Sequence, residues 1–371
     1  MKVRLVLAVV LLFVLLAVAI PGCAPAPATV EKPAVPDKPA ADKPAVKPML
    51  YTPLDKDNAL HNTAGMIYEW WYLDAAFDNG YSTSFSWQVV TQDFIGKDRP
   101  TRLVQFAIYD PSGKKTSVDA GFKPEEVTVS ADICNVKMGD NQLKGSYPKW
   151  DVSFRQGDLG AQLTFESLAE GFKTPPDGVV YFSRQPEKYI GWVIAQPRAK
   201  VTGKLILNGK EIPVSGVGYH DHNWGNCSLK EMYNYWYWGR MYLPEYTFVY
   251  SVGQMVDALG KKPSSVIFAF KGPKLLEVST EITVDASDFV LDPFTGAKYP
   301  RSVVLHPSGK AISGTVTHKL RNLVEALPPW GAQPGDGHAY FRFLSDCDID
   351  LVAAGDKIQV KTPLIHEFMI P

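Results

Sequence analysis

Apolar and polar residues alternate with a period of two along much of the chain after residue 50. The clearest alternation lies in residues 81–90, where Phe85, Trp87 and Val89 share one side of an extended chain. No long segment has a convincing helical period of 3.6 residues. Many short strands joined by regular turns predict an all-β sandwich or barrel. Similar alternation recurs in residues 150–155, 161–168, 246–252, 265–270 and 340–344, with turn signals at Asn79-Gly80, Ser112-Gly113, Asn208-Gly209 and Ser308-Gly309.

The first 22 residues have the pattern of a secretory signal. Lys2 and Arg4 precede an uncharged apolar run over residues 5–20, which is shorter than the roughly 20 residues of a membrane-spanning helix. The run ends in Ile20-Pro21-Gly22-Cys23, which resembles the lipobox of bacterial lipoproteins and implies cleavage before Cys23 and acylation of that cysteine. An uncleaved N-terminal anchor is the alternative. Both interpretations, the cleaved lipoprotein and the uncleaved anchor, place the rest of the chain outside the cytoplasm. We expect an extracytoplasmic, membrane-anchored bacterial lipoprotein.

Residues 23–49 predict a disordered tether between the anchor and the folded body. After Cys23 this segment contains seven Pro, seven Ala and four Lys, and it has no aromatic residue. Such a composition cannot bury enough surface to offset the entropy lost on ordering. Frequent proline favours extended, semi-rigid conformations. The remaining residues, 50–371, are numerous enough for two domains of typical size.

Composition excludes several functional classes. A net charge of −1 and the lack of a basic stripe give no electrostatic reason to bind nucleic acid. The sequence contains no P-loop, no Gly-x-Ser-x-Gly and no Gly-x-Gly-x-x-Gly at a strand–helix junction.

If Cys23 carries lipid, Cys134, Cys227 and Cys347 remain, so we expect at most one disulfide and a free thiol. No Cys-x-x-Cys pair suggests a zinc knuckle.

Two aromatic-rich motifs carry the candidate chemistry. The first is YEWWYLD over residues 68–74, in which Glu69 and Trp71 would share one face of a strand and Trp70 and Asp74 the other. The second is GVGYHDHNWG over residues 216–225, followed by YNYWYWGR over residues 233–240. On a strand, the tyrosines of this last segment would lie on one face, and its tryptophans and Arg240 on the other.

EWWYLD, GYHDHNWG and WYWGR, in this order and spacing, resemble the hydroxyneurosporene synthase superfamily, also called the AttH-like or lipocalin-like family. The family includes bacterial carotenoid 1,2-hydratases, fungal kievitone hydratase and fungal decalin-forming Diels–Alderases. The resemblance implies two tandem lipocalin-like (calycin) β-barrels, which follow the lipoprotein signal and the tether. We place them at residues 50–226 and 227–371. A barrel of about eight strands can hold one small ligand, and the family implies a polyene, terpenoid or polyketide.

The resemblance also implies a catalytic group. In the carotenoid hydratases a His and a Trp of the second motif act with a downstream Tyr and an acid, and His222, Trp224 and Tyr250 match the first three. No carboxylate stands at the expected place beside Tyr250, so we include Asp221 as the candidate acid. Hydration of an alkene needs an acid that protonates carbon and a site that tolerates a cation. Aromatic faces stabilise such a cation by roughly 0.5–2 kcal/mol each.

Further residues are expected to contact the ligand, and each has a structural alternative. The aromatic residues could pack in a core, and Asp221 with His222 could form a buried network that caps loop backbone groups. Glu69 and Asp74 are alternative acids, and Arg240 could pair with Glu69 or Asp221. His220 and His222 alternate as metal ligands can, but no third ligand is evident, so we predict no metal site. The predicted ligand contacts are Glu69, Trp71, His220, Tyr235, Trp236, Trp238 and Arg240.

Two functions fit these features. The first is an enzyme, a hydratase, isomerase or cyclase that acts on a hydrophobic polyene or terpenoid by acid/base catalysis and needs no cofactor. The second is a non-catalytic, lipocalin-type carrier of a membrane lipid. In both, the partners are a hydrophobic small molecule and, through the anchor, the membrane. The motifs favour the enzyme, and an anchored extracytoplasmic location favours the carrier.

The lipobox predicts that Cys23→Ser releases the chain from the membrane. Because the acyl chains would be attached to the thiol and the amino group of Cys23, the variant should be recovered in the soluble fraction. It should also lose the radiolabelled palmitate that the wild type incorporates in the same cells. Palmitate labelling of the variant at the wild-type level would contradict the lipobox interpretation.

Overall fold

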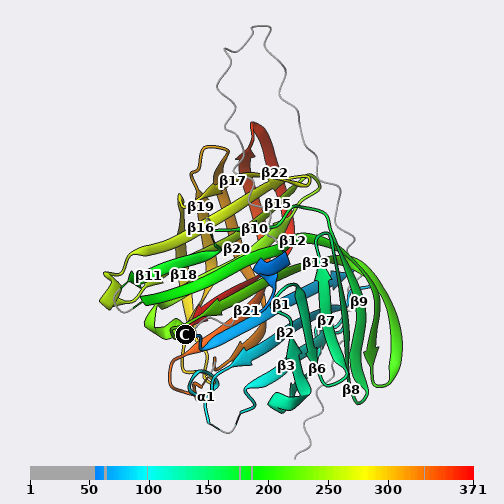
Figure 1. Ribbon diagram of the computed structural model, residues 1–371. Helices are drawn as coiled ribbons and strands as arrows, with labels where there is room; N and C mark the ends of the chain where they lie inside the picture. The colour runs from blue at the N-terminus through cyan, green and yellow to red at the C-terminus, as the bar shows by residue number, and fades with distance from the viewer. Residues whose placement is uncertain (1–54, 62–64, 98, 175–176, 185–186, 330) are drawn as a thin grey trace, which may run out of the picture.

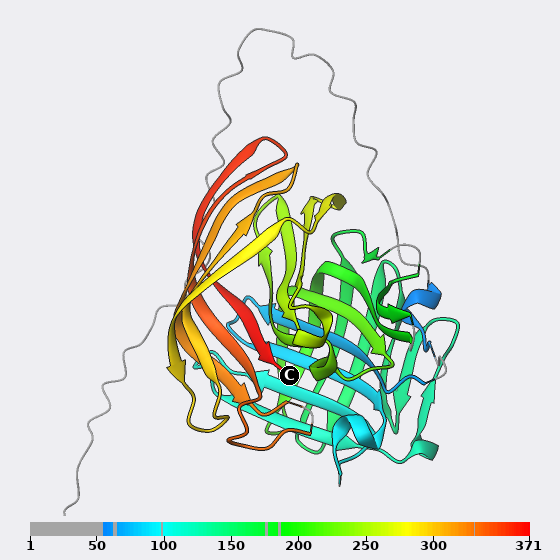
Figure 2. The same cartoon turned by 90° about the vertical axis from the view of Figure 1, so that its left-hand side faces the viewer.

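Alternating strands and tight turns build two strongly curled β-sheets in the computed structural model (Figure 1, Figure 2). The structure describes residues 55–371 apart from 62–64, 98, 175–176, 185–186 and 330. The predicted signal peptide, Cys23 and the tether lie outside the described residues. The all-β, lipocalin-like fold is confirmed by this architecture and by the solved structures compared below. Within the described ranges, no helix is both long and apolar enough to cross a membrane.

The first sheet has 13 strands, in the hydrogen-bonded order β4-β3-β2-β1-β13-β12-β9-β8-β7-β6-β5, with β10 and β11 also paired to β12. Its strands are antiparallel to their neighbours, and β1 and β13 lie side by side near the middle of the order. The strands are β1 (Tyr68–Phe77), β2 (Ser82–Val90), β3 (Arg102–Tyr109), β4 (Lys115–Gly121), β5 (Val127–Val129), β6 (Cys134–Met138), β7 (Asn141–Ser146), β8 (Lys149–Gln156), β9 (Leu159–Ser167), β10 (Phe172–Lys173), β11 (Val179–Arg184), β12 (Glu187–Leu207) and β13 (Lys210–Gly225).

The second sheet has nine strands in the order β17-β16-β15-β14-β22-β21-β20-β19-β18. Its strands are β14 (Tyr233–Tyr242), β15 (Tyr246–Met255), β16 (Pro263–Lys271), β17 (Lys274–Ser279), β18 (Ile282–Leu291), β19 (Lys298–Pro307), β20 (Ile312–Leu327), β21 (Ala339–Ala353) and β22 (Asp356–Ile370). The helical elements are all short: α1 (Gln92–Ile95), η1 (Asp55–Asn58), η2 (Pro124–Glu126), η3 (Leu229–Glu231) and η4 (Asp257–Leu259).

The strands and turns predicted from the alternation pattern are confirmed. Residues 81–90 overlap β2, and the other five alternating segments overlap β8, β9, β15, β16 and β21. Gly80, Gly113 and Gly209 lie in the turns after β1, β3 and β12 with φ values of 85°, 84° and 75°. These left-handed values suit glycine because it lacks a Cβ. We retain residues 50–226 and 227–371 as proposed domains.

Three of the apolar clusters in the described part of the chain hold the sheets together. Residues of the first sheet, including Trp71, Trp87 and Phe154, form one core, and residues of the second sheet, including Phe341 and Phe343, form another. A third cluster, which includes Tyr219, Val249 and Phe268, contains side chains of both sheets. The third cluster therefore joins the two sheets. Cys134, Cys227 and Cys347 are free and buried.

A side chain at Gly191 of β12 should strongly lower the stability of the fold. This glycine lies opposite Trp224 of β13, and a Cβ on Gly191 would come within 2.0 Å of the Trp224 indole. Gly191→Ala should therefore lower the free energy of unfolding by about 1–3 kcal/mol, the usual cost of overpacking, in a urea titration. Gly113→Asn is the control, because no atom lies within 4 Å of a Cβ there and Asn tolerates a left-handed backbone. Equal midpoints for Gly191→Ala and the wild type would contradict this packing.

Candidate functional site

A cavity of about 750 Å³ lies between the two sheets. This volume falls within the roughly 300–1,000 Å³ typical of small-molecule sites. β1 to β4, β12 and β13 of the first sheet line it, together with β14, β15 and β20 to β22 of the second. Aromatic side chains are prominent in its wall: Tyr68, Trp70, Tyr72, Tyr109, Trp192, Tyr233, Trp236, Trp238 and Tyr340.

Asp221 of β13 is a carboxyl group in this wall. Its Oδ2 accepts hydrogen bonds from Trp192 Nε1 and from the Tyr219 hydroxyl, each at 2.9 Å, and its Oδ1 accepts from Asn223 Nδ2 at 2.9 Å. Asp221 is only 6% exposed. Burial raises its pKa to about 7, although the bonds from Trp192 and Tyr219 act in the opposite direction. The group is therefore a carboxylic acid that can hold and release a proton near neutral pH.

Arg240 of β14 lies near Asp221 but pairs with a different carboxylate. Its Nη2 donates to both oxygens of Asp74, at 2.5 and 2.7 Å, and its guanidinium lies over the rings of Tyr219 and Trp238, at 4.7 and 5.0 Å. The predicted pairing of Arg240 with Glu69 or Asp221 was wrong. Arg240 and Asp74 have opposite effects on the pKa of Asp221. Arg240 lowers this pKa and Asp74 raises it. Burial therefore decides the protonation of Asp221.

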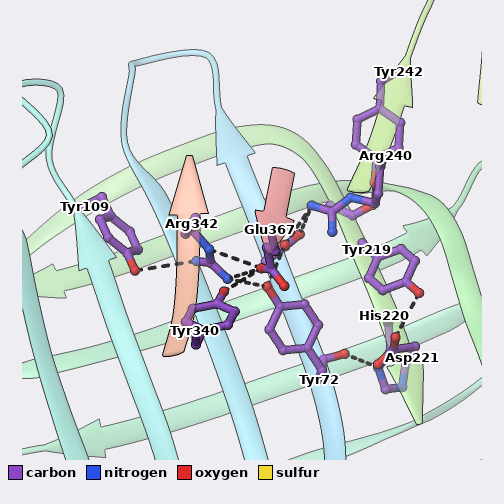
Figure 3. A network of polar contacts seen from close by, with 12 residues as sticks. Tyr72, Tyr109, Tyr219, His220, Asp221, Arg240, Tyr242, Tyr340, Arg342 and Glu367 are labelled. Atoms are coloured by element: carbon purple, nitrogen blue, oxygen red, sulfur yellow. Dashed lines mark hydrogen bonds and ion pairs between the residues drawn. The ribbon is translucent and has the colours of Figure 1, made fainter. Parts of the chain in front are cut away.

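A second polar network crosses the cavity between the sheets (Figure 3). Arg342 of β21 donates through Nη2 to Glu367 Oε1 at 2.8 Å and to the Tyr72 hydroxyl at 2.9 Å. The Tyr340 hydroxyl donates to the same Glu367 oxygen at 2.6 Å. The Tyr72 hydroxyl in turn donates to Asp74 Oδ2 at 2.9 Å, so this network continues into the Arg240–Asp74 pair.

Sequence reasoning missed Arg342, Glu367 and Tyr340. They belong to strands in the last third of the chain, where no motif was recognised. One signal was present in the alternating segment 340–344, YFRFL. There Phe341 and Phe343 lie in the core of the second sheet, so the charged residue between them has to face the other side of the strand.

Several predicted site residues lie on the far face of the first sheet. Along β13, His220, His222 and Trp224 alternate with Asp221 and Asn223, so these two sets of side chains point to opposite faces. The cavity is lined by Asp221 and Asn223. It is not lined by His220, His222 and Trp224, nor by Glu69 and Trp71 of β1. His222 Nε2 lies 2.9 Å from Glu69 Oε1, and the indole of Trp71 stacks on His222 with 4.5 Å between ring centroids. His220 contacts Asn58 Nδ2 at 2.8 Å.

The remaining predicted residues divide between the second core and the cavity. Tyr250 is 1% exposed and lies in the core of the second sheet, against which Tyr235 packs. Trp236 and Trp238 line the cavity, as their predicted face requires. The cavity therefore includes Asp221 from the predicted catalytic group and does not include His222, Trp224 or Tyr250.

Comparisons with known proteins agree with this architecture. A sequence model described as AttH-like matches residues 48–323. The quinolone epoxide rearrangement protein penF of Penicillium thymicola is 30% identical over 272 residues, which cover 69% of this chain and 69% of that protein. The hydroxyneurosporene dehydrogenase of Chlorobaculum tepidum is 26% identical over 227 residues, 50% of this chain and 56% of that protein.

A solved structure shares the fold. The crystal structure of an AttH candidate from Nitrosomonas europaea aligns with a TM-score of 0.62 at 15% identity, and it covers 87% of this chain and 99% of that chain. At this identity the match establishes the common arrangement of strands. It does not by itself transfer a reaction or a ligand.

The raised pKa of Asp221 predicts a pH-dependent stability. The ordinary value of 3.8 applies to the unfolded chain, and the folded value is about 7. The folded chain therefore binds this proton more tightly, so the stabilisation is complete below about pH 4 and is lost as the pH rises through 7. Asp221→Asn cannot ionise and should be more stable than the wild type at pH 8.5, by at most about 4 kcal/mol.

Thermal and urea unfolding between pH 4.5 and 8.5 measure this difference, which should shrink towards the acidic end. Asp119→Asn is the matched control, because Asp119 also lines the cavity but its side chain is 48% exposed and pairs with Arg99. Exposed pairs of this kind contribute about 0–1 kcal/mol. A stability difference for Asp221→Asn that does not vary with pH would contradict the raised pKa.

Proposed function

The chain belongs to the AttH-like family, and we propose that it is an acid-catalysing member that binds a hydrophobic polyene- or terpenoid-type molecule between its two sheets. The proposed reaction is a hydration, isomerisation or cyclisation that uses no cofactor. The proposal keeps the expected location, in which a lipid on Cys23 anchors the chain on the outer side of a membrane. A substrate already dissolved in that membrane would then reach the cavity without crossing the cytoplasm.

One observation carries this proposal: a carboxyl group with a pKa near 7 lies in the aromatic wall of a large cavity. Such a group is protonated in a large share of molecules at neutral pH, as a general acid has to be. Oδ2 accepts from Trp192 and Tyr219, and among the described residues Oδ1 has a single hydrogen-bond donor, Asn223. Oδ1 therefore has the free lone pair on which the acidic proton can sit.

The proton balance of a hydration follows from this geometry. The O–H bond of Asp221 breaks as a C–H bond forms at one alkene carbon, and the positive charge appears on the neighbouring carbon. The faces of Trp192 and Trp236 supply the quadrupoles that stabilise a cation, whereas Trp238 already lies under the Arg240 guanidinium. Water then adds to the cation, and its proton returns to the Asp221 carboxylate. In an isomerisation the carboxylate instead removes a proton from the adjacent carbon.

The relatives support the class of chemistry. The name of the Penicillium thymicola protein refers to rearrangement of a quinolone epoxide, and the name of the Chlorobaculum tepidum protein to hydroxyneurosporene. Opening of an epoxide is also promoted by a proton donor, so an acid in the cavity suits that reaction type. The alternative function is a non-catalytic carrier of a membrane lipid. The lipobox sequence at residues 20–23 favours this alternative.

The first experiment identifies the ligand and tests turnover together. The chain is purified from its own host, and native mass spectrometry with lipid extraction identifies the molecule that accompanies it. That molecule is then incubated with the protein in ¹⁸O-labelled water and in D₂O. Hydration adds ¹⁸O to the molecule, and isomerisation introduces deuterium. A bound molecule that gains neither label and keeps its chromatographic retention would support the carrier.

Asp221→Asn tests the acid itself. The variant should retain the ligand, because Asn has the same shape and its amide oxygen can still accept from Trp192 and Tyr219. Its NH2 group replaces the oxygen to which Asn223 donates, so the Asn223 amide has to turn and present its own oxygen. Turnover should fall by about 10²–10⁴-fold, the usual contribution of an acid–base group. Wild-type turnover should also decline above pH 7 as Asp221 ionises. Asp348→Asn is the activity control, because Asp348 is an exposed carboxylate that pairs with Lys361 away from the cavity, and it should keep both activity and pH profile. Full activity of Asp221→Asn would refute the assignment.

A further inference from the structure

His61, Glu69 and His222 form a cluster on the face of the first sheet that points away from the cavity. Glu69 Oε1 lies 2.9 Å from His222 Nε2 and 3.3 Å from His61 Nδ1. These three side chains can offer ligand atoms that all lie within 4.8 Å of one another. Glu69 and His222 are fully buried, whereas the His61 side chain is 18% exposed. The cluster is therefore enclosed on the sheet side and reachable from solvent on the His61 side.

The hydrogen-bonding roles in this cluster leave a positive charge to be supplied. His222 Nδ1 lies 3.1 Å from the carbonyl oxygen of Asp57, which can only accept, so Nδ1 carries the proton. In a neutral imidazole Nε2 is then an acceptor, yet it faces a carboxylate oxygen, which is an acceptor too. Two lone pairs at 2.9 Å require a cation shared between them. That cation is either a second proton on His222 or a metal ion.

Three further features favour a metal ion. A second imidazole, that of His61, converges on the same Glu69 oxygen as His222, so two histidine nitrogens and one carboxylate oxygen meet at one place. The other oxygen of Glu69, Oε2, is buried and has no hydrogen-bond partner within the described part of the chain. Ligand atoms of a tetrahedral zinc ion with bonds of about 2.0–2.1 Å lie roughly 3.3 Å apart. The separations of 2.9 and 3.3 Å are close to this value.

We propose that His61, Glu69 and His222 bind a divalent transition-metal ion, with zinc as the ion that best suits two imidazoles and one carboxylate. The Asp57 carbonyl then has the role of the outer partner that fixes the ring of a metal-bound histidine. Trp71 stacks on His222 and Trp224 on His61, with 4.5 and 3.5 Å between ring centroids. These indoles hold both imidazoles in their orientation and limit access of water.

The site has a structural role in this proposal. His61 belongs to the segment before β1, while Glu69 and His222 belong to β1 and β13. A metal ion bound by all three would attach residues 55–61 to the central strand pair of the first sheet. This role is independent of the proposed acid catalysis, because Asp221 faces the opposite side of β13.

The test uses the full-length chain in detergent, stripped with a chelator and then dialysed against zinc. Bound zinc is counted by inductively coupled plasma mass spectrometry, and Co²⁺ loading is followed by the visible absorption of a tetrahedral cobalt centre. Glu69→Gln removes the carboxylate but keeps a side-chain amide that can donate to His222 Nε2, so it preserves the contact without the charge. His61→Gln changes the partly exposed ligand and disturbs the buried core least.

Two histidine variants control for adventitious binding. His306→Gln changes a surface histidine that pairs with Asp285 at 3.0 Å. His318→Gln changes a buried histidine of β20, whose Nδ1 lies 3.0 Å from Cys347 Sγ, and so tests a buried histidine away from the proposed site. Both controls should bind zinc as the wild type does.

The wild type should bind about one zinc ion per chain, and Glu69→Gln and His61→Gln should bind it more than about 10–100-fold more weakly, since loss of an outer partner alone has that effect. A chelator should lower the melting temperature of the wild type and leave that of Glu69→Gln unchanged. Zinc binding of Glu69→Gln at the wild-type level would overturn the proposal. So would a wild-type chain that binds no zinc and no cobalt, a result that would assign the cluster to an imidazolium–carboxylate pair.

Discussion

Neighbouring residues of a β-strand point to opposite faces of a sheet, and this constraint decides what each residue of the β1–β13 pair can do. β13 lies between β1 and β12 within the first sheet, with an apolar core on one face and the second sheet on the other. Asp221 therefore reaches the cavity while His222, the next residue, reaches the Glu69 cluster behind it. The register pairs Tyr72 with Asp221 and Trp71 with His222. Two distinct sites thus share one pair of strands.

The second sheet is held in place over these strands by buried polar contacts. Arg240 reaches across to Asp74, and Arg342 to the Tyr72 hydroxyl. A buried charge is costly unless it is paired, and the loss of one partner typically costs about 3–5 kcal/mol. The contacts therefore fix where the second sheet sits and, with it, the width of the cavity. They also pair Arg240 with Asp74, so burial remains the main influence on the pKa of Asp221.

Local pattern predicted the faces of the strands but could not predict which strands meet. Alternation in residues 68–74 correctly separated Glu69 and Trp71 from Trp70 and Asp74, and alternation in β14 separated Trp236 and Trp238 from Tyr235 and Tyr237. The prediction was wrong for Tyr233, which lines the cavity with the tryptophans because the register shifts between Tyr233 and Tyr235. The contact of Arg342 with Tyr72 joins residues 270 positions apart, and that of His222 with Glu69 joins residues 153 apart. Such pairings depend on strand order and register, and a shift of one residue would send each side chain to the other face. Arg342 and Glu367 were overlooked for this reason, whereas His61 belongs to the segment before β1, where no strand pattern predicts the path of the chain.

The two walls of the cavity differ in what they contribute, and this difference bears on how the family could diversify. The first sheet supplies the acid together with the side chains that orient it, Trp192, Tyr219 and Asn223. The opposite wall includes Trp236, Trp238 and Met369, which come from β14 and β22 and make no hydrogen bond to Asp221 in the described residues. Substitutions in that wall can reshape the space for a new molecule and leave the proton donor where it is. A laboratory search for new substrates would begin with those three positions.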